Sequence, residues 1–347
     1  MLFRKKKTFV TLLIICFLLV QTIIISPVFA ESSGTNRLAG DNRYQTAIAI
    51  SQKGWTTADY AVLARGDNFA DALCAVPLAA KNNGPILLTE PNALNPDTLK
   101  ELQRLGVKQL IIVGGTGAVS QKAEDAVKAS GITEIERIFG NDRYETSAKI
   151  AEKLDNSTQV ALATGNDFPD ALSISAVAAN LGIPILLTEK NGLPASVSGY
   201  LNGKSVSKTY IVGGTGVIGT NVEAQVSGAL RLAGNDRYET NVAITKNFES
   251  SFDFNSIYIA TGGGLKGDQF ADALTGAVLA AKNSSPLFLT GQVMPRGTAD
   301  YLKTKILLAS KATGLGGTSV VSAATLGSIL GYKNGIAVSA KYESGDL

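Results

Sequence analysis

The sequence predicts an α/β fold built from three tandem copies of one unit of about a hundred residues. Two observations support this. Four short sequence blocks recur in the same order three times, and within each copy short apolar runs alternate with helix-like stretches. Uniformly apolar strands separated by helices are typical of a parallel sheet that helices cover on both faces.

The first recurring block opens each copy with a pair of arginines. It reads Arg37-Leu-Ala-Gly-Asp-Asn-Arg43-Tyr44-Gln-Thr46 in the first copy and returns at 137–146 and 231–240. The offset from Arg43 to Arg143 is 100 residues, and the offset from Arg143 to Arg237 is 94. Self-similarity at a nearly fixed period is the signature of a repeat architecture.

Three further blocks follow in each copy. Phe69-Ala-Asp71-Ala-Leu73 returns at 168–172 and 270–274, and Pro85-Ile-Leu-Leu-Thr89 returns at 184–188 and 286–290. Val113-Gly-Gly-Thr-Gly117 returns at 212–216 and, more loosely, at 315–319. Four blocks in one order, three times over, establish the repeat.

The alternation of apolar runs predicts the elements of each copy. In the first copy we expect strands at 61–64, 86–88 and 110–113, and helices at 71–81, 97–105 and 121–129. The third copy departs from this pattern twice. Its first strand-to-helix loop is lengthened at 262–267, and Ala312-Thr-Gly314 replaces the apolar third strand, so we describe its end as degenerate.

The first 30 residues have the pattern of a secretory signal peptide. Four basic residues at 4–7 precede a long apolar run, and Val28-Phe29-Ala30 supplies the small residues of a cleavage site. The competing interpretation is an uncleaved anchor, because the apolar run nearly spans a bilayer. We expect cleavage before Glu31, giving a signal peptide at 1–30 and copies at 31–136, 137–230 and 231–347, with no additional domain.

Removal of the signal peptide changes the charge balance. The chain has 32 basic and 29 acidic residues, and four of the basic ones lie in the first 30, leaving 28 against 29. The mature chain therefore has no general field that would attract nucleic acid or a membrane surface. Binding to a polyanion would depend on local arginine or lysine clusters.

The residue counts also limit catalysis. The chain contains no histidine, which excludes histidine-ligated zinc sites and Ser-His-Asp triads. The mature chain keeps one cysteine, Cys74, at a position where the other copies have Ser173 and Thr275. We therefore expect no catalytic residue, no metal site and no cofactor.

Together the four blocks resemble the type-two cell-wall-binding repeat of Gram-positive surface proteins, a family that usually carries three tandem copies. The resemblance covers the whole mature chain. It implies a Rossmann-like (toprim-like) fold for each copy, with the three packed about a pseudo-threefold axis. It also implies a secreted protein held at the cell wall by non-covalent attachment to an anionic secondary wall polymer or a peptidoglycan-associated glycan, with other surface proteins as further partners.

The arginine pairs are the candidate polymer-binding residues. Arginine makes bidentate contacts with carboxylate or phosphate groups. The alternative is that these side chains form internal salt bridges, such as Arg43 with Asp71, which lock one helix to another. The six candidates are Arg37, Arg43, Arg137, Arg143, Arg231 and Arg237.

The aspartates and glycines of the other blocks are predicted to be structural. Asp71, Asp170 and Asp272 come three residues after Asn68, Asp167 and Gln269, of which Asn68 and Asp167 are candidate N-caps, as in a capping box. The alternative pairs each with a neighbouring carboxylate as a metal or general-acid site, but Asn166 breaks that pairing in the second copy. The turns that contain Gly115, Gly214 and Gly317 are either tight strand-to-helix turns or phosphate cradles.

The expected function is that of a wall-binding module. Two alternatives remain, a structural component of a surface layer and a wall-lytic enzyme of the N-acetylmuramoyl-L-alanine amidase type or its modifier. Zinc amidases need histidine ligands, and this chain has none.

Overall fold

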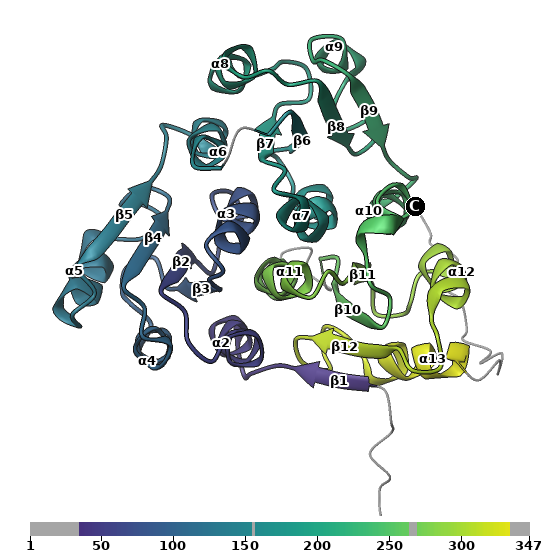
Figure 1. Cartoon of the computed structure of the whole chain (residues 1–347), viewed down its shortest axis with the longest axis horizontal. Coiled ribbons are helices and arrows are strands. Elements are labelled where there is room, and N and C mark those ends of the chain that lie inside the picture. Colours follow the sequence, from purple (N-terminus) through teal and green to yellow (C-terminus); the bar gives the residue numbers. More distant parts are fainter. Residues whose placement is uncertain (1–34, 155–156, 264–268, 334–347) are drawn as a thin grey trace, which may run out of the picture. The chain divides into compact units, whose positions relative to one another are not determined.

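The computed structural model describes residues 35–154, 157–263 and 269–333 (Figure 1). The expected signal peptide at 1–30 lies outside these residues. The chain divides into two units, Met1–Ser33 and Gly34–Leu347, and all described residues belong to the second. Among them, no helix combines the length and the apolar character that crossing a membrane would require.

The described residues form three parallel sheets of four strands each. The first has the order β3-β2-β4-β5, the second β7-β6-β8-β9 and the third β11-β10-β12-β1. Their bounds are β2 Tyr60–Arg65, β3 Ile86–Thr89, β4 Gln109–Val113 and β5 Glu134–Ile138; β6 Gln159–Thr164, β7 Ile185–Thr188, β8 Lys208–Val212 and β9 Ala229–Leu232; β10 Ser256–Thr261, β11 Leu287–Thr290, β12 Lys311–Leu315 and β1 Thr35–Leu38.

Each sheet takes its fourth strand from the start of the following arginine block. β5 carries Arg137 and pairs with β4, β9 carries Arg231 and pairs with β8, and β1 carries Arg37 and pairs with β12. The strand nearest the N-terminus thus completes the sheet of the third copy, and the three copies form a closed cycle. Figure 1 shows β1 lying beside β12.

The helices that follow the arginine blocks begin at the second arginine of each pair. They are α2 Arg43–Gly54, α6 Arg143–Glu152 and α10 Arg237–Asn247. The residue before each one, Asn42, Asp142 or Asp236, accepts a hydrogen bond from the free backbone N–H groups of the first turn. Asparagine and aspartate are preferred at this position for that reason.

Two further helix sets complete the sheets. One set lies between the second and third strands of each sheet: α4 Pro96–Leu105, α8 Ala195–Gly203 and α12 Arg296–Lys305. The other follows the glycine turns: α5 Gln121–Ala129, α9 Thr220–Glu223 and α13 Ala323–Lys333. A 3₁₀ turn, η2, covers Glu249–Ser251.

Three alanine-rich helices meet between the sheets. They are α3 Val76–Lys81, preceded by the 3₁₀ turn η1 Leu73–Ala75, together with α7 Pro169–Leu181 and α11 Ala271–Lys282. Each contacts the other two. At their N-terminal ends Phe69, Phe168 and Phe270 form a ring of aromatic contacts with centroid separations of 5.3, 5.8 and 5.7 Å. The expected α/β fold with pseudo-threefold packing is confirmed.

The structure adjusts several predicted elements. The strands at 61–64, 86–88 and 110–113 and the helices at 97–105 and 121–129 are present within one or two residues of the expected bounds. The helix expected at 71–81 is a 3₁₀ turn at first and becomes α-helical only at Val76. The degenerate third strand forms as β12, because β10 and β1 pair with it on either side.

Candidate functional site

The recurring blocks gather where the parallel strands end. The Phe-x-Asp-Ala-Leu block follows the first strand of each sheet, the glycine turn follows the third strand, and the second arginine follows the fourth. In open parallel α/β sheets, ligands bind outside the carboxyl ends of the strands. The blocks therefore lie where this fold class places its binding sites.

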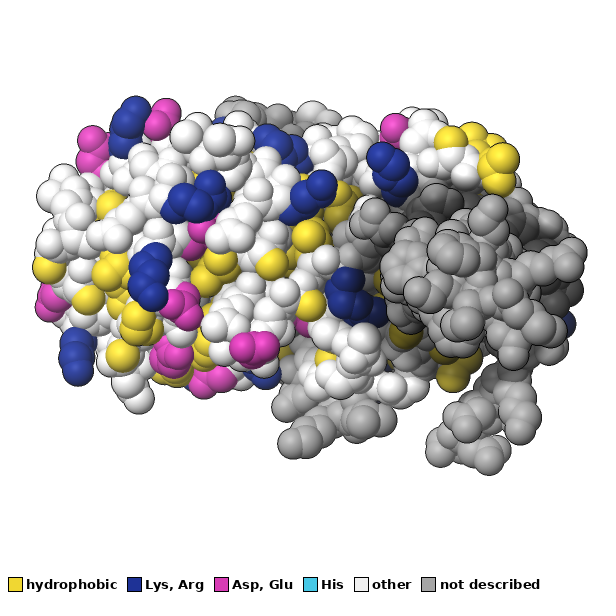
Figure 2. All heavy atoms as spheres, turned by 90° about the horizontal axis from the view of Figure 1, so that it is seen from below, with side chains coloured by type: hydrophobic (Ala, Val, Ile, Leu, Met, Phe, Trp, Pro, Cys, Tyr) yellow, Lys and Arg dark blue, Asp and Glu magenta, His cyan; other side chains and the backbone are white. Residues whose placement is uncertain are grey.

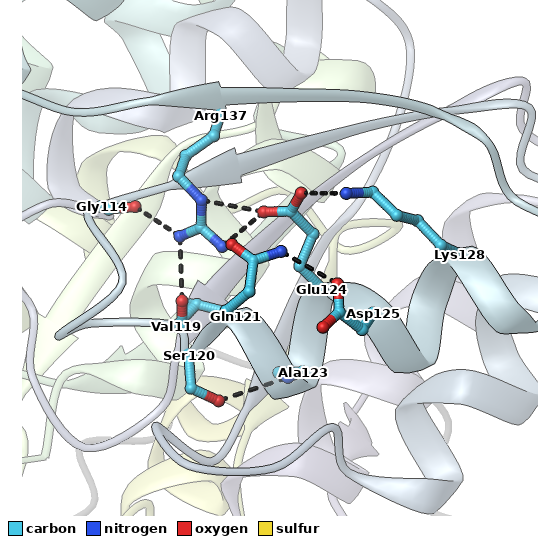
Figure 3. Close-up of polar contacts among 9 residues, drawn as sticks. All are labelled: Gly114, Val119, Ser120, Gln121, Ala123, Glu124, Asp125, Lys128 and Arg137. Carbon is cyan, nitrogen blue, oxygen red and sulfur yellow. Dashed lines mark hydrogen bonds and ion pairs between the residues drawn. The ribbon is translucent and has the colours of Figure 1, made fainter.

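The first arginine of each pair is held inside the fold. Arg137 donates to the carbonyl oxygens of Gly114 and Val119, both at 2.9 Å, and its Nη2 lies 2.7 Å from Glu124 Oε2 (Figure 3). Arg231 makes the same contacts with Gly213 at 2.8 Å and with Glu223 at 2.8 Å. These side chains fasten the glycine turn to the fourth strand.

Arg37 also donates to backbone carbonyl oxygens, but it has no carboxylate partner equivalent to Glu124 or Glu223. Its guanidinium donates to Gly316 at 2.6 Å and Val321 at 2.8 Å, and the position of Glu124 and Glu223 is occupied by Leu326 in the third copy. Burial lowers the Arg37 pKa.

Among the second arginines, Arg237 is more accessible than the first arginines Arg137 and Arg231. The Arg237 side chain is 35% exposed, against 11% for Arg137 and 16% for Arg231. Each second arginine donates one bond within its own copy: Arg43 to Gly66 O, Arg143 to Gly165 O, and Arg237 to Gly262 O at 2.7 Å. Arg43 and Arg143 also lie over the rings of Phe270 and Phe69.

The tyrosine after each second arginine packs against a glycine. A Cβ atom on Gly66, Gly165 or Gly262 would lie within 2.8 Å of the tyrosine ring of the same copy, namely Tyr44, Tyr144 or Tyr238. These rings thus pack at the start of a helix.

The aspartates do not cap their helices as predicted. Phe168 and Phe270 occupy the N-cap positions of α7 and α11 without a side-chain hydrogen bond, so Asp170 and Asp272 stand at the second helical residue and not at the third. Asp167, the expected cap, instead accepts the backbone N–H of Phe168 at 2.9 Å. The predicted capping box is therefore not formed in the second and third copies, whereas in the first copy Asn68 Oδ1 accepts the backbone N–H of Ala70 at 3.0 Å.

Each aspartate lies against a glycine turn. The first glycine of the turn has a positive φ of 97° at Gly114, 107° at Gly213 and 93° at Gly316. A Cβ atom there would lie 2.7, 2.3 and 2.1 Å from Oδ2 of Asp71, Asp170 and Asp272, in that order. The sequence had singled out the second glycines, Gly115, Gly214 and Gly317, but the first is the constrained one, because it needs both the left-handed backbone and the absent side chain.

The aspartate of one copy faces the second arginine of the next. Asp71 is within electrostatic range of Arg143, Asp170 of Arg237, and Asp272 of Arg43. The internal pair envisaged between Arg43 and Asp71 is therefore replaced by a cyclic arrangement that crosses copies, because the fourth strand of each sheet leads directly into the arginine of the next copy.

We call these three places junctions, each consisting of an aspartate, a glycine turn, and the arginine and threonine of the next copy. Junction 1 contains Asp71, Gly114, Arg143 and Thr146; junction 2 contains Asp170, Gly213, Arg237 and Thr240; junction 3 contains Asp272, Gly316, Arg43 and Thr46.

Burial disfavours the charged form of all three junction carboxyls. It raises the pKa of Asp170 to about 6, with a further contribution from Asp167, and Arg237 acts in the opposite sense. It also raises the pKa of Asp272 to about 6, against the effects of Arg43 and of the Thr46 hydroxyl. The pKa of Asp71 is raised by burial as well, while Thr146, Arg143 and Arg65 lower it.

Two junctions contain open pockets. The pocket at junction 2 measures about 290 Å³ and is lined by Asp167, Asp170, Arg237 and the turn from Gly214 to Val217, among others. The pocket at junction 3 measures about 220 Å³ and includes Arg43, Asp272 and Gly317. Each is large enough for a sugar residue or a phosphate group, but not for a folded partner.

The described residues do not favour a metal site or a cysteine nucleophile. No group of three or more histidine, cysteine, aspartate or glutamate side chains there is arranged to hold a metal ion. Cys74 is buried, and burial raises the pKa of its thiol, which does not favour a nucleophile. The face in Figure 2 shows basic and acidic side chains scattered among hydrophobic ones, with no continuous field of one sign.

The chain is similar to a known family and to solved structures. The Cell wall binding domain 2 (CWB2) family matches in three segments, residues 37–124, 137–223 and 231–326. The solved structures of Cwp6 and Cwp8 from Clostridium difficile superpose with TM-scores of 0.80 and 0.78 at 29% and 30% identity, covering 86% of this chain and 48% and 52% of theirs.

Two similar proteins come from Bacillus subtilis (strain 168). The N-acetylmuramoyl-L-alanine amidase LytC is 33% identical over 300 residues, which are 86% of this chain and 58% of that protein. The amidase enhancer is 34% identical over 293 residues, which are 83% of this chain and 39% of that protein. This chain thus spans only part of the length of both relatives. The three matched segments cover most of the sequence, and the chain belongs to the cell wall binding domain 2 family.

Proposed function

We propose that this protein is exported and attaches non-covalently to an anionic polymer of the bacterial cell wall. The observation that carries the proposal is the threefold recurrence of one polar junction in a chain of the cell wall binding domain 2 family. A repetitive polymer presents the same group many times, and three similar junctions on one folded unit can engage it together. Linked contacts strengthen binding by roughly 10²–10⁴ over one contact.

We assign the polymer contacts to the second arginines, Arg43, Arg143 and Arg237. Each uses one nitrogen to hold a backbone carbonyl, and Arg237 remains one-third exposed. A guanidinium anchored in this way keeps other N–H groups for a phosphate or carboxylate. The first arginines, Arg37, Arg137 and Arg231, support the turns that border the same junctions.

We propose binding without hydrolysis. LytC is named as an amidase, but this chain matches only part of its length. The chain offers no histidine, and the carboxyls of the junctions face arginines and glycine turns. An amidase that relies on histidine-ligated zinc cannot be built from these residues.

The experiment is co-sedimentation of the purified mature chain with Gram-positive cell walls, native or acid-extracted to remove anionic polymers. The protein should pellet with native walls and stay in solution with extracted ones. Increasing salt should weaken binding, since exposed charge contacts are screened. The same incubation should release no soluble wall fragments. Equal binding to both wall preparations would exclude the anionic polymer.

The variant arm replaces Arg43, Arg143 and Arg237 by Gln, singly and together. Single replacements should weaken wall binding and the triple replacement should abolish it, with the melting temperature followed in parallel. Arg296→Gln is the matched control, because Arg296 is 81% exposed and lies outside the junctions. Weakening that appears only together with loss of stability would contradict the assignment.

A further inference from the structure

The three junctions are not chemically equal, because junction 1 has an exposed aromatic ring at its rim. Phe139 is 47% exposed, and the equivalent residues of the other copies are Ala39 and Ala233. It lies between the end of β5 at Ile138 and the start of α6 at Arg143. Exposing a large apolar ring to water is unfavourable, so a phenylalanine at this position calls for an explanation.

The fold does not need an aromatic side chain there. The residue that follows, Gly40, Gly140 or Gly234, donates its N–H to the threonine hydroxyl of the same block at 3.1, 3.0 and 3.0 Å. The local turn is therefore formed equally well after alanine and after phenylalanine. Ring burial does not account for Phe139 either, since nearly half of the residue is in solvent, although the ring also lies under Lys149 Nζ, which is 5.8 Å from its centroid.

Junction 1 also has an additional arginine, Arg65, which lies outside the arginine pairs. Arg65 is replaced by Thr164 and Thr261 in the other copies. Its guanidinium grips Asp67 with Nε–Oδ1 at 2.6 Å and Nη2–Oδ2 at 2.8 Å, and it acts on Asp71 together with Arg143. At junction 2, by contrast, the single Arg237 stands against both Asp167 and Asp170.

The ring and the Asp71 carboxylate border the same turn, and Arg65 and Arg143 act on that carboxylate. A Cβ atom on Gly114 would lie 2.7 Å from Asp71 Oδ2, and one on Gly115 would lie 3.5 Å from Phe139 Cδ2. The two glycines are consecutive, so the two contact points are separated by about 3.8 Å of backbone. Gly117, further along the turn, has no neighbouring atom within 4 Å of a Cβ placed there, so this end of the turn is open.

We propose that junction 1 is an acidic-saccharide subsite, in which Phe139 stacks on the apolar face of a sugar ring and Arg65 and Arg143 bind its anionic substituent. This rests on the proposed wall-polymer function and makes junction 1 its strongest contact. A sugar ring presents C–H groups on one face and hydroxyls at its edge. The aromatic ring can stack on the C–H face of the sugar, and the backbone of the turn and the arginines can bind the polar groups at its edge.

The first test is Phe139→Ala, which gives junction 1 the residue that the other two junctions already have. Wall binding should weaken roughly two- to tenfold, the range expected for one aromatic contact, with an unchanged melting temperature. Arg65→Thr should also weaken binding. Leu307→Ala is the control, since Leu307 is 60% exposed and belongs to no junction.

The second test detects contact directly. Phe139→Trp keeps an aromatic ring and adds an exposed indole to a chain whose only other tryptophan, Trp55, is buried. Soluble anionic polymer extracted from walls should change the fluorescence of this variant and not that of the wild type. Two results would overturn the subsite, provided that the wild-type protein binds walls. One is that Phe139→Ala binds walls as well as the wild type does. The other is that the fluorescence of Phe139→Trp does not change when polymer is added. Wild-type protein that does not bind walls at all would instead refute the proposed function.

Discussion

The junction aspartates illustrate how single residues can be placed at a cost in stability. Asp272 lies against Gly316 with its carboxyl largely out of water, and the nearby Arg43 and Thr46 only partly offset the desolvation. Its pKa of about 6 means that the folded protein holds this proton more tightly than the unfolded chain does, where an aspartate titrates near about 3.9.

This pKa gives a prediction for the dependence of stability on pH. As pH rises from about 4 to about 6 the unfolded chain loses the Asp272 proton first, so this group lowers the free energy of unfolding over that window and leaves it constant above. Asp272→Asn cannot ionise. Its free energy of unfolding relative to wild type should therefore rise between pH 4 and pH 7, by up to about 3 kcal/mol.

Urea denaturation at a series of pH values measures this difference. The matched control is Asp300→Asn, because an ion pair with Lys303 lowers the pKa of Asp300. An aspartate whose pKa is lower in the folded protein than in the unfolded chain stabilises the fold at pH values above its unfolded pKa. Asp300→Asn should therefore lose stability relative to wild type as pH rises through about 4. A pH-independent difference for Asp272→Asn would show that its carboxyl is not desolvated in the folded protein.

At the residue scale, the repeat alone revealed which positions matter but not their partners. The six arginines and three aspartates follow from the recurring blocks. Their pairing does not, because Asp71 meets Arg143 only through the path of β5 into α6, and sequence spacing contains no information on that path. Phe139 and Arg65 could have been noticed as departures from the repeat, since both are confined to one copy.

At the scale of elements, the fourth strand of each sheet and the first arginine that it carries act together. β5, β9 and β1 each add to the preceding sheet and carry an arginine that holds the glycine turn of that sheet. Apolar runs and helix caps were sufficient to predict most elements of a copy. They could not predict that the fourth strand of each sheet begins the next block, since edge strands such as β5 alternate polar and apolar residues.

The arginines of these strands should differ in their contribution to stability. Arg137→Gln leaves two carbonyl oxygens without their donor and leaves the part-buried Glu124 paired with Lys128 alone, so we expect a loss of about 1–3 kcal/mol, the cost of leaving buried polar groups unsatisfied. Arg37→Gln leaves only carbonyl oxygens, because Leu326 stands where the carboxylate would be. We expect a smaller loss for Arg37→Gln in chemical denaturation. Equal losses would mean that the ion pair adds nothing to the turn.

At the scale of the whole folded unit, the three copies share one central interior, and the second and third copies each have a further cluster of their own. A single hydrophobic cluster includes Leu73 of the first copy, Leu172 of the second and Leu274 of the third, together with the rings of Phe168 and Phe270. Almost every residue of α7 is buried, although it belongs to one copy only. The sequence predicted three similar units, but the extent of burial between them depends on the central helices and is not visible in the blocks.

A shared interior predicts that the copies unfold together. The fragment 137–230 keeps only Arg137 and Ile138 of β5, whose partner β4 lies in the first copy; it also lacks half of β9 and exposes the face of α7 that packs on α3 and α11. We expect this fragment to lack a cooperative unfolding transition in circular dichroism, whereas the full chain unfolds in one transition with a denaturant slope that reflects its whole surface.

The fragment 143–232 contains a complete second sheet but still exposes α7, so it should also be unstable. Separate transitions in the full chain, or a cooperative one in either fragment, would show that each copy has a sufficient core of its own. The junctions would then be contacts between independent domains, and wall binding could survive in a single copy.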